Sequence, residues 1–203
     1  LERFINEPQV EMDPIVRAAL VHYQFETAHP FLDGNGRLGR LLITLMLIND
    51  GVLHSCLFYP SFQFKKNRSE YYRQLTSVRE RGTYEEWIEF FCNSLLESAK
   101  DSVGSLKNLV DLHNRSTATI TENLGRTAAN GQRLLGILEE HPIVDTAFIA
   151  AQLDIGRSTA SSLVKSFEEL GILRPLDESR QRYRQYGYEE YLSILREDAE
   201  PIR

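Results

Sequence analysis

The segment His29–Arg40 and the apolar run directly after it constrain the fold of this chain more than any other feature. The segment reads HPFLDGNGRLGR, and Leu41–Ile48 continues it as LLITLMLI. An apolar run of this length predicts a buried helix. Gly34 and Gly36 then fall where the first backbone N–H groups of the helix lack acceptors, and such an end attracts anions. The sequence therefore predicts an anion-binding site at residues 34–36.

Charged and titratable side chains surround this predicted anion site. Arg37 and Arg40 are three residues apart and share one helical face, from which each can bind phosphate oxygens through paired N–H groups. Asp33 can hold Mg²⁺, because this ion takes only one or two protein carboxylates in nucleotide sites. His29 can be neutral near pH 7 and can accept a proton from a hydroxyl group. These residue types together indicate phosphate chemistry on a nucleotide.

Gly34–Gly39 also spells G-x-G-x-x-G, the fingerprint of dinucleotide-binding folds. That fingerprint requires a β-strand before it and an acidic residue on a second strand about twenty residues later. Ile15–Ala28 instead has a helical pattern, and Ser55–Ser61 contains no acidic residue. Since the chain also lacks a Walker-type Gly-Lys-Ser/Thr, the sequence argues against both kinds of nucleotide-binding fold.

The segment HPFLDGNGRLGR resembles the signature of the Fic (Fic/Doc) family, H-x-F-x-[D/E]-G-N-G-R-x-x-R, at every defined position. Leu57–Asn67 and Arg68–Tyr72 are similar to the segment that follows the motif helix in this family, so the resemblance covers about the first half of the chain. It implies transfer of AMP from ATP onto a Ser, Thr or Tyr hydroxyl of a target protein. A branch of the family that acts as a kinase carries lysine where this chain has Gly36, which favours AMP transfer here.

The resemblance also implies a role for each motif residue. His29 would be the general base, Phe31 would pack inward and fix the loop, and Asp33 would bind Mg²⁺ between the α- and β-phosphates. The arginines would hold the β- and γ-phosphates of ATP, and two tyrosines would border the adenine. The implied nucleotide-binding residues are Asp33, Gly34, Asn35, Gly36, Arg37, Leu38, Gly39, Arg40, Tyr71 and Tyr72.

Most of these residues also have an ordinary structural interpretation. Asp33 could cap the turn before Gly34, and Arg40 could be a solvated helix residue. Tyr71 and Tyr72 could equally be core aromatics at helical spacing. The histidines outside the motif are expected to be structural or exposed, and they are His22, His54, His113 and His141.

Periodicity and turn residues predict a mainly α chain with two domains. A Fic helical bundle is expected over residues 1–115, with Asp13 and Pro14 starting the helix that leads to the motif. The motif helix should end near Gly51, and further helices should cover residues 69–81 and a long core stretch that includes Trp87 and Val110. Residues 116–130, richer in Thr, Asn and Gly, are expected to be a linker or the end of that long helix.

Residues 131–190 resemble a small winged helix-turn-helix domain with a β-hairpin wing, followed by a tail over 191–203. The expected helices cover 132–140, a segment from the cap Asp145 to Leu153, and 158–170, and the expected strands cover 172–174 and 182–186. The third helix would present polar side chains to DNA bases or phosphates, with two arginines on the wing. These residues are Arg157, Ser158, Thr159, Ser161, Ser162, Lys165, Arg180 and Arg182.

The charge of the chain argues against DNA as the favoured partner. Its net charge is −6, whereas attraction to phosphate usually dominates affinity for nucleic acid. Docking of a target protein or of the Fic domain itself is the alternative use of the winged helix, and a homodimer stays open. The alternative function is a DNA-binding transcriptional regulator whose Fic domain senses nucleotide or is inactive.

Composition and cysteine usage predict a cytoplasmic globular protein with no membrane segment. The 203 residues are 42% hydrophobic and 26% charged, and the two cysteines have no metal-type spacing. Since the chain starts at Leu1 rather than Met, we expect further sequence upstream. The inhibitory motif [S/T]-x-x-x-E-[G/N] of the family has no proper copy here, because Thr76–Glu80 is followed by Arg81. We expect that helix before Leu1 or on another chain.

Overall fold

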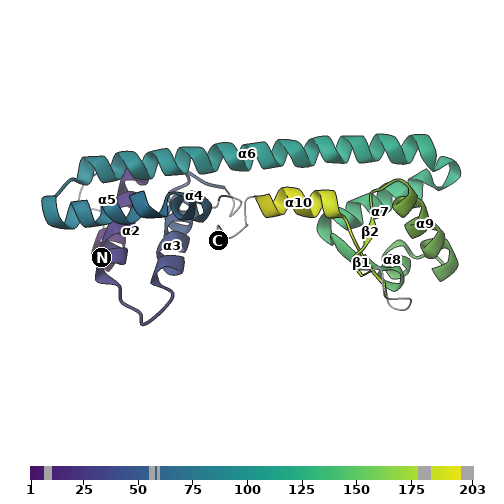
Figure 1. Cartoon of the computed structure of the whole chain (residues 1–203), viewed down its shortest axis with the longest axis horizontal. Coiled ribbons are helices and arrows are strands. Elements are labelled where there is room, and N and C mark those ends of the chain that lie inside the picture. The colour runs from purple at the N-terminus through teal and green to yellow at the C-terminus, as the bar shows by residue number, and fades with distance from the viewer. Residues whose placement is uncertain (7–10, 55–57, 59, 178–183, 198–203) are drawn as a thin grey trace. The chain divides into compact units, whose positions relative to one another are not determined.

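The computed structural model describes residues 1–6, 11–54, 58, 60–177 and 184–197 (Figure 1). The chain is mainly helical, with one small sheet, and divides into two compact units, Leu1–Val103 and Gly104–Ala199. Helix α6 (Tyr84–Asn123) contributes residues to both units. None of the helices in the described part is both long enough and apolar enough to cross a membrane.

The described elements of the first unit are all helices. Besides the first part of α6, its helices are α1 (Glu2–Asn6), α2 (Pro14–Ala28), α3 (Asn35–Asn49), α4 (Ser61–Lys66) and α5 (Arg68–Arg81). The predicted start of α2 is confirmed, because Asp13 Oδ1 accepts from the Ile15 N–H at 2.8 Å. Gly82 ends α5 in the left-handed conformation, with φ of 71°.

Aromatic side chains form the core of the first unit. Trp87 and Phe91 of α6 are fully buried, and Trp87 Nε1 donates to the Ala19 carbonyl of α2 at 3.0 Å. Phe64 of α4 also belongs to this core. The core thus fixes α2, the helix that leads into the motif, against α6.

The prediction that the apolar run of the motif helix is buried is wrong for one side of α3. Leu47 is 2% exposed, but Leu41 and Leu45 are 52% and 50% exposed. Similarly, Leu106 and Val110 of α6 were expected in the core and are 48% and 59% exposed. The side chains of a continuous apolar run point to all sides of a helix, whereas the neighbouring elements cover only one side of it. The apolar side chains on the other side therefore stay exposed.

The second unit combines helices with a three-stranded antiparallel sheet. Besides the end of α6, its elements are η1 (Gly125–Thr127), α7 (Ala128–Glu140), β1 (Ile143–Asp145), α8 (Thr146–Leu153), α9 (Arg157–Glu169), β2 (Arg174–Pro175), β3 (Gln185–Gly187) and α10 (Glu189–Glu197). The strand order is β1-β3-β2, and Tyr186 of β3 pairs with Val144 and with Pro175. Leu134, Ile149 and Phe167 lie at the centre of its core.

The predicted elements of the second unit agree with most of this structure. Asp145 caps α8 by accepting from the Phe148 N–H at 2.7 Å, and the β2–β3 pairing confirms an antiparallel hairpin. Strand β1 and helix α10 were not predicted, and α7 starts four residues earlier than expected. The wing residues Arg180 and Arg182 lie outside the described residues.

Candidate active site

The connection between α2 and α3 starts at a left-handed residue. His29 follows the last residue of α2 with φ of 43° and ψ of 56°, and its N–H donates to the Phe25 carbonyl at 3.0 Å. In the described part of the chain, His29 and Asp154 are the non-glycine residues with positive φ. Non-glycine residues in this conformation are strained, and such strain concentrates at functional sites.

The His29 imidazole is exposed and oriented by the backbone. Its Nδ1 lies 3.3 Å from the Glu26 carbonyl oxygen. A carbonyl can only accept, so Nδ1 carries the hydrogen and Nε2 is left with a free lone pair. This tautomer leaves Nε2 able to accept a proton from a group in solution.

Asn35 holds the loop between the two helices. Its buried side chain bonds the backbone of Phe31 twice: Nδ2 donates to the Phe31 carbonyl at 2.5 Å, and Oδ1 accepts from the Phe31 N–H at 2.9 Å. The Phe31 side chain, predicted to pack inward, is 52% exposed and contacts the Phe25 ring at 6.4 Å between centroids. The loop is therefore fixed through its backbone, and the inward packing of Phe31 is wrong.

The first turn of α3 presents free backbone donors. Along this end of α3, the first backbone N–H group with a helical hydrogen bond is that of Leu38, which donates to the Gly34 carbonyl at 3.0 Å. The N–H groups of residues 35–37 precede it and have no acceptor within the helix. Gly34, with φ of 83°, supplies the left-handed turn before α3. This is the geometry of a helix end that attracts anions.

Asp33 stands in front of this helix end. Its side chain is 95% exposed; Oδ1 accepts from the Gly34 N–H at 2.6 Å, and Oδ2 lies 3.5 Å from Arg37 Nη2. The Arg37 side chain is itself 78% exposed. The carboxylate thus has the predicted turn contact and still faces solvent, where it could bind a cation brought by a nucleotide.

Arg40 is anchored across the site by a residue that the sequence did not indicate. Its Nε donates to Ser61 Oγ of α4 at 3.2 Å. A Cβ atom on Gly36 would lie 3.1 Å from Arg40 Nη1. Gly36 therefore leaves room for the guanidinium group next to the helix start, which places one positive charge near the free N–H groups.

Gly39 faces α2 rather than the free helix end. Its carbonyl accepts from His22 Nδ1 at 3.0 Å, and a Cβ atom there would lie 3.1 Å from the Phe25 ring. The same Cβ would lie 2.5 Å from Glu26 Oε1. Gly39 thus permits close packing of α3 on α2, whereas the neighbouring Leu38 is 41% exposed.

His22 and Tyr71 form a buried polar pair behind the motif helix. His22 Nδ1 donates to Gly39, so Nε2 accepts from the Tyr71 hydroxyl at 2.9 Å. Burial lowers the pKa of His22 to about 4, so the ring is neutral at pH 7. Tyr71 is 3% exposed, which corrects the expectation that it borders an adenine and favours the core interpretation. Tyr72 is 52% exposed, with the Arg68 guanidinium carbon 5.7 Å from its ring centroid.

The remaining histidines have the structural surroundings expected of them. His113 Nδ1 lies 2.7 Å from a carboxylate oxygen of Glu139, and the His141 ring packs edge-on against Phe148 at 5.2 Å. His54 is exposed. His29 is the histidine that lies beside the free end of α3.

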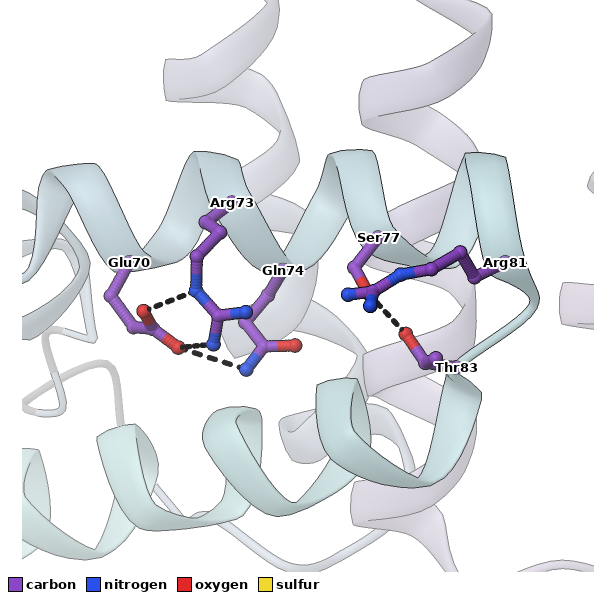
Figure 2. A network of polar contacts seen from close by, with 6 residues as sticks. All are labelled: Glu70, Arg73, Gln74, Ser77, Arg81 and Thr83. Atoms are coloured by element: carbon purple, nitrogen blue, oxygen red, sulfur yellow. Dashed lines mark hydrogen bonds and ion pairs between the residues drawn. The ribbon is translucent and has the colours of Figure 1, made fainter.

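A polar network follows one side of α5 (Figure 2), and a hollow lies along the same helix. Arg73 donates to both carboxylate oxygens of Glu70 at 2.7 and 2.5 Å, and Arg81 donates to Ser77 Oγ at 2.7 Å. The hollow has a volume of about 360 Å³ and is lined by Ser69, Tyr72, Arg73, Thr76, Ser77, Glu80 and Arg81. Of this lining, the sequence had indicated Tyr72 alone as a binding residue.

Glu26 is a second residue of the site that motif reasoning did not find. It lies on α2, its Oε1 is buried, and that atom has no hydrogen-bond partner. Burial raises the pKa of Glu26, and the positive charge of Arg40 opposes this shift. A buried acceptor without a donor, which only a structure reveals, is the signal that marks this residue.

The region that carries the motif is similar to known proteins. Residues 1–47 match the family model of the Fic/DOC family. Over 102 residues, half of this chain, it is 34% identical to protein adenylyltransferase fic-1 of Caenorhabditis briggsae, covering 19% of that protein. Over 93 residues, 45% of this chain, it is 37% identical to protein adenylyltransferase Fic of Drosophila ananassae, covering 17% of that protein.

The family match covers residues 1–47, and the matches to relatives cover about half of this chain and a small share of each relative. The matched segment spans about a fifth of the length of the curated relatives. The family match over residues 1–47 includes the connection between α2 and α3, which carries His29, Asp33 and the free helix end. The motif region of this chain is thus similar to the Fic/DOC family.

Proposed function

We propose that this protein is a protein adenylyltransferase that transfers AMP from ATP to a Ser, Thr or Tyr hydroxyl of a target protein and of itself. One observation carries the proposal: the oriented imidazole of His29 lies in the same short loop that opens onto the free N–H groups of α3. A base and an anion site in one rigid loop are the two parts that such a transfer needs. The relatives named protein adenylyltransferase support the same activity.

The phosphates of ATP would lie across the N-terminal end of α3. The N–H groups of residues 35–37, Arg37 and Arg40 would neutralise them, which matters because the leaving pyrophosphate gathers negative charge. Among the described residues there is no group of three or more His, Cys, Asp or Glu that could hold a metal ion. A single exposed carboxylate, Asp33, is nevertheless suited to Mg²⁺ that also binds phosphate, and the ion would add positive charge between the phosphates.

His29 would act as general base. The target hydroxyl loses its proton to Nε2 as its oxygen bonds to the α-phosphorus of ATP, and the bond from that phosphorus to the bridging oxygen breaks. AMP stays on the hydroxyl oxygen, and pyrophosphate leaves with the electron pair. The Nδ1 contact with the Glu26 carbonyl keeps Nε2 in the accepting state. Tyr72, which is exposed, would border the adenine.

Transfer of label from ATP tests this proposal. We expect protein labelling from ATP labelled at the α-phosphate in the presence of Mg²⁺, and none from ATP labelled at the γ-phosphate. His29→Ala should abolish the labelling, whereas His54→Ala should retain it, because His54 is an exposed histidine away from the motif. Labelling by the γ-phosphate would indicate a kinase instead, and an active His29→Ala would remove the base from the mechanism.

The second unit supports a second candidate function. We infer that α8 and α9 are the two helices of a winged helix-turn-helix and that the β2–β3 hairpin begins its wing. On α9 the residues expected to face DNA are all exposed, namely Arg157, Ser158, Thr159, Ser161, Ser162 and Lys165. The net charge of −6 makes a protein partner the better fit.

Measurement of the affinity for duplex DNA at several salt concentrations distinguishes between the two candidate partners of the second unit, DNA and protein. A DNA-binding regulator would bind with an affinity that falls steeply with salt and would lose affinity on Arg157→Ala. We expect binding that stays weak and unaffected by Arg157→Ala. Tight, salt-sensitive binding together with no transfer of α-label would favour the regulator over the enzyme.

A further inference from the structure

Arg40 is held in the free protein by a contact with a different helix. It is half-buried, and its Nε donates to Ser61 Oγ of α4 at 3.2 Å. The other motif arginine, Arg37, has a side chain that is 78% exposed, and its Nη2 lies 3.5 Å from the carboxylate of Asp33. A long side chain loses rotamer freedom when a ligand fixes it. The contact with Ser61 therefore reduces the entropy that phosphate binding must still remove from Arg40.

The contact with Ser61 leaves the outer end of the guanidinium group unoccupied. A guanidinium group only donates, so Ser61 Oγ is the acceptor for Nε. In the described part of the chain, Nη1 and Nη2 of Arg40 form no hydrogen bond or ion pair. Arginine binds phosphate through parallel N–H groups. Both Nη groups are thus available for a phosphate while Nε is held.

The held guanidinium group lies beside the start of α3. A Cβ atom on Gly36 would lie 3.1 Å from Nη1 and 3.9 Å from Nη2 of Arg40. Gly36 is one of the residues whose backbone N–H has no acceptor within the helix. The two Nη groups and the free N–H groups are therefore neighbours, and both attract a negative charge.

Helix α4, which carries Ser61, is itself fixed to other helices of the first unit. Gln63 is 4% exposed, and its Nε2 donates to Asp101 Oδ2 of α6 at 2.6 Å. Phe64 is buried and stacks on the His22 ring of α2 at 5.7 Å between centroids. A residue can orient its neighbour only if its own position is fixed. Ser61 meets this condition through the next residues of its helix.

We propose that Ser61 is a positioning residue for Arg40: its hydroxyl oxygen holds Nε, so that Nη1 and Nη2 lie beside Gly36 for phosphate binding. The inference rests on the proposed function, in which Arg40 binds the phosphates of ATP. A partner that orients a ligand-binding group increases affinity without touching the ligand. Ser61 thereby contributes to nucleotide binding from outside the motif.

A double-mutant cycle on nucleotide binding tests the coupling. Binding of Mg-ATP to the full chain is measured by calorimetry for wild type, Ser61→Ala, Arg40→Ala and the double variant. We expect Ser61→Ala to weaken binding about fivefold when Arg40 is present and less than about twofold when it is absent, because the hydrogen bond then no longer exists. Equal losses in both backgrounds, or no loss in the wild-type background, would overturn the inference.

Two further variants separate the hydrogen bond from packing, and they decide the question if Arg40→Ala binds too weakly to measure. Ser61→Thr keeps the hydroxyl and should bind Mg-ATP within about twofold of wild type, whereas Ser61→Cys keeps the size but is a weak acceptor and should bind like Ser61→Ala. Ser105→Ala, at a half-buried serine of α6, is the matched control and should bind normally. An unchanged midpoint of thermal unfolding shows that each variant is folded.

The outcomes for the two proposals differ. A wild-type chain that does not bind Mg-ATP would overturn the proposed function and this inference with it. Normal binding by wild type, together with wild-type affinity in Ser61→Cys or an affinity in Ser61→Thr as low as that of Ser61→Ala, would overturn the inference alone.

Discussion

At the scale of single residues, the loop between α2 and α3 owes its shape to contacts with the backbone. His29 is set by its left-handed conformation and by the Glu26 carbonyl, and Asn35 clamps both polar groups of the Phe31 backbone. Exposed side chains in the loop, such as Phe31 and Asp33, do not hold it in place. Asn35 therefore has a mechanical role in addition to the predicted contribution of its N–H group to the anion site.

Removal of the Asn35 side chain should damage both stability and activity. Asn35→Ala breaks two hydrogen bonds and leaves Phe31 backbone groups unpaired, which we expect to cost about 1–3 kcal/mol in the free energy of unfolding. Loss of loop geometry should reduce AMP transfer by about tenfold to a hundredfold. Asn93→Ala, at an exposed site on α6, should change stability by less than about 0.5 kcal/mol. Full activity in Asn35→Ala would show that the clamp is dispensable.

His22 should make the stability of the protein depend on pH. The pKa of His22 is about 4 in the folded protein and 6.5 in the unfolded chain, so the unfolded chain takes up a proton first as the pH falls. Stability is thus lost as the pH falls from 6.5 toward 4. We expect wild type to lose about 2 kcal/mol more than His22→Gln between about pH 7.5 and 5. His54→Gln is the control.

Denaturant unfolding at the two pH values gives the measurement for His22. The control, an exposed histidine, should have the same pH dependence as wild type. If His22→Gln also kept the wild-type pH dependence, the buried neutral pair of His22 and Tyr71 would be contradicted.

The sequence predicted which residue types gather at the start of α3 but could not tell which way each side chain faces. The motif put His29 and Asp33 next to a helix start, and the structure has them there, both exposed. Tyr71 and Tyr72 are adjacent in sequence, yet one is buried and the other exposed. Which of two neighbouring aromatics faces the core depends on contacts with His22 from a helix far along the chain, and such contacts leave no local pattern.

At the scale of elements, the helix ends were predictable because their signals are local. Asp13 with Pro14, Gly51, Gly82 and Asp145 mark ends that the structure has within about two residues. The short strand β1 was missed because three residues carry too little periodicity, and its pairing with β3 is distant in sequence. Which face of α3 is covered also depends on distant partners.

The two faces of α3 should respond differently to the same substitution. Leu47→Ala removes a buried side chain and should cost about 2–5 kcal/mol in the free energy of unfolding, whereas Leu45→Ala should cost less than about 0.5 kcal/mol. Denaturant unfolding of the two variants checks this. Equal losses would mean that the Leu45 face is covered in the protein in solution.

A buried ion pair fastens α2 to the end of α3. Arg17 bonds both carboxylate oxygens of Asp50, and the two side chains are only 13% and 11% exposed. Asp50→Asn leaves a buried guanidinium without its counter-charge and should cost about 3 kcal/mol. Glu97→Gln, which breaks the exposed pair with Lys100, should cost less than about 1 kcal/mol. Thermal unfolding of both variants tests whether the loss of stability is larger for the less exposed ion pair.

At the scale of the whole molecule, the chain combines a region similar to the Fic/DOC family with a second unit that has its own core. Both units bury aliphatic and aromatic residues, the first around Trp87 and the second around Phe167. The sequence predicted a mainly α chain with a small β-hairpin, and the structure confirms this coarse description. The polar side chains on the exposed face of α9 left no pattern that predicts a partner, since such side chains suit both a protein and a nucleic acid, and the net charge of −6 is what favours a protein.

The central claim is that the loop from His29 to Arg40 transfers AMP to protein hydroxyls. The most direct measurement is mass spectrometry of a cell lysate and of the protein itself after incubation with ATP and Mg²⁺, with wild type compared with His29→Ala. We expect wild type to add the mass of one AMP group to Ser, Thr or Tyr side chains and His29→Ala to add none. Addition of phosphate alone, or equal modification by both proteins, would contradict the claim.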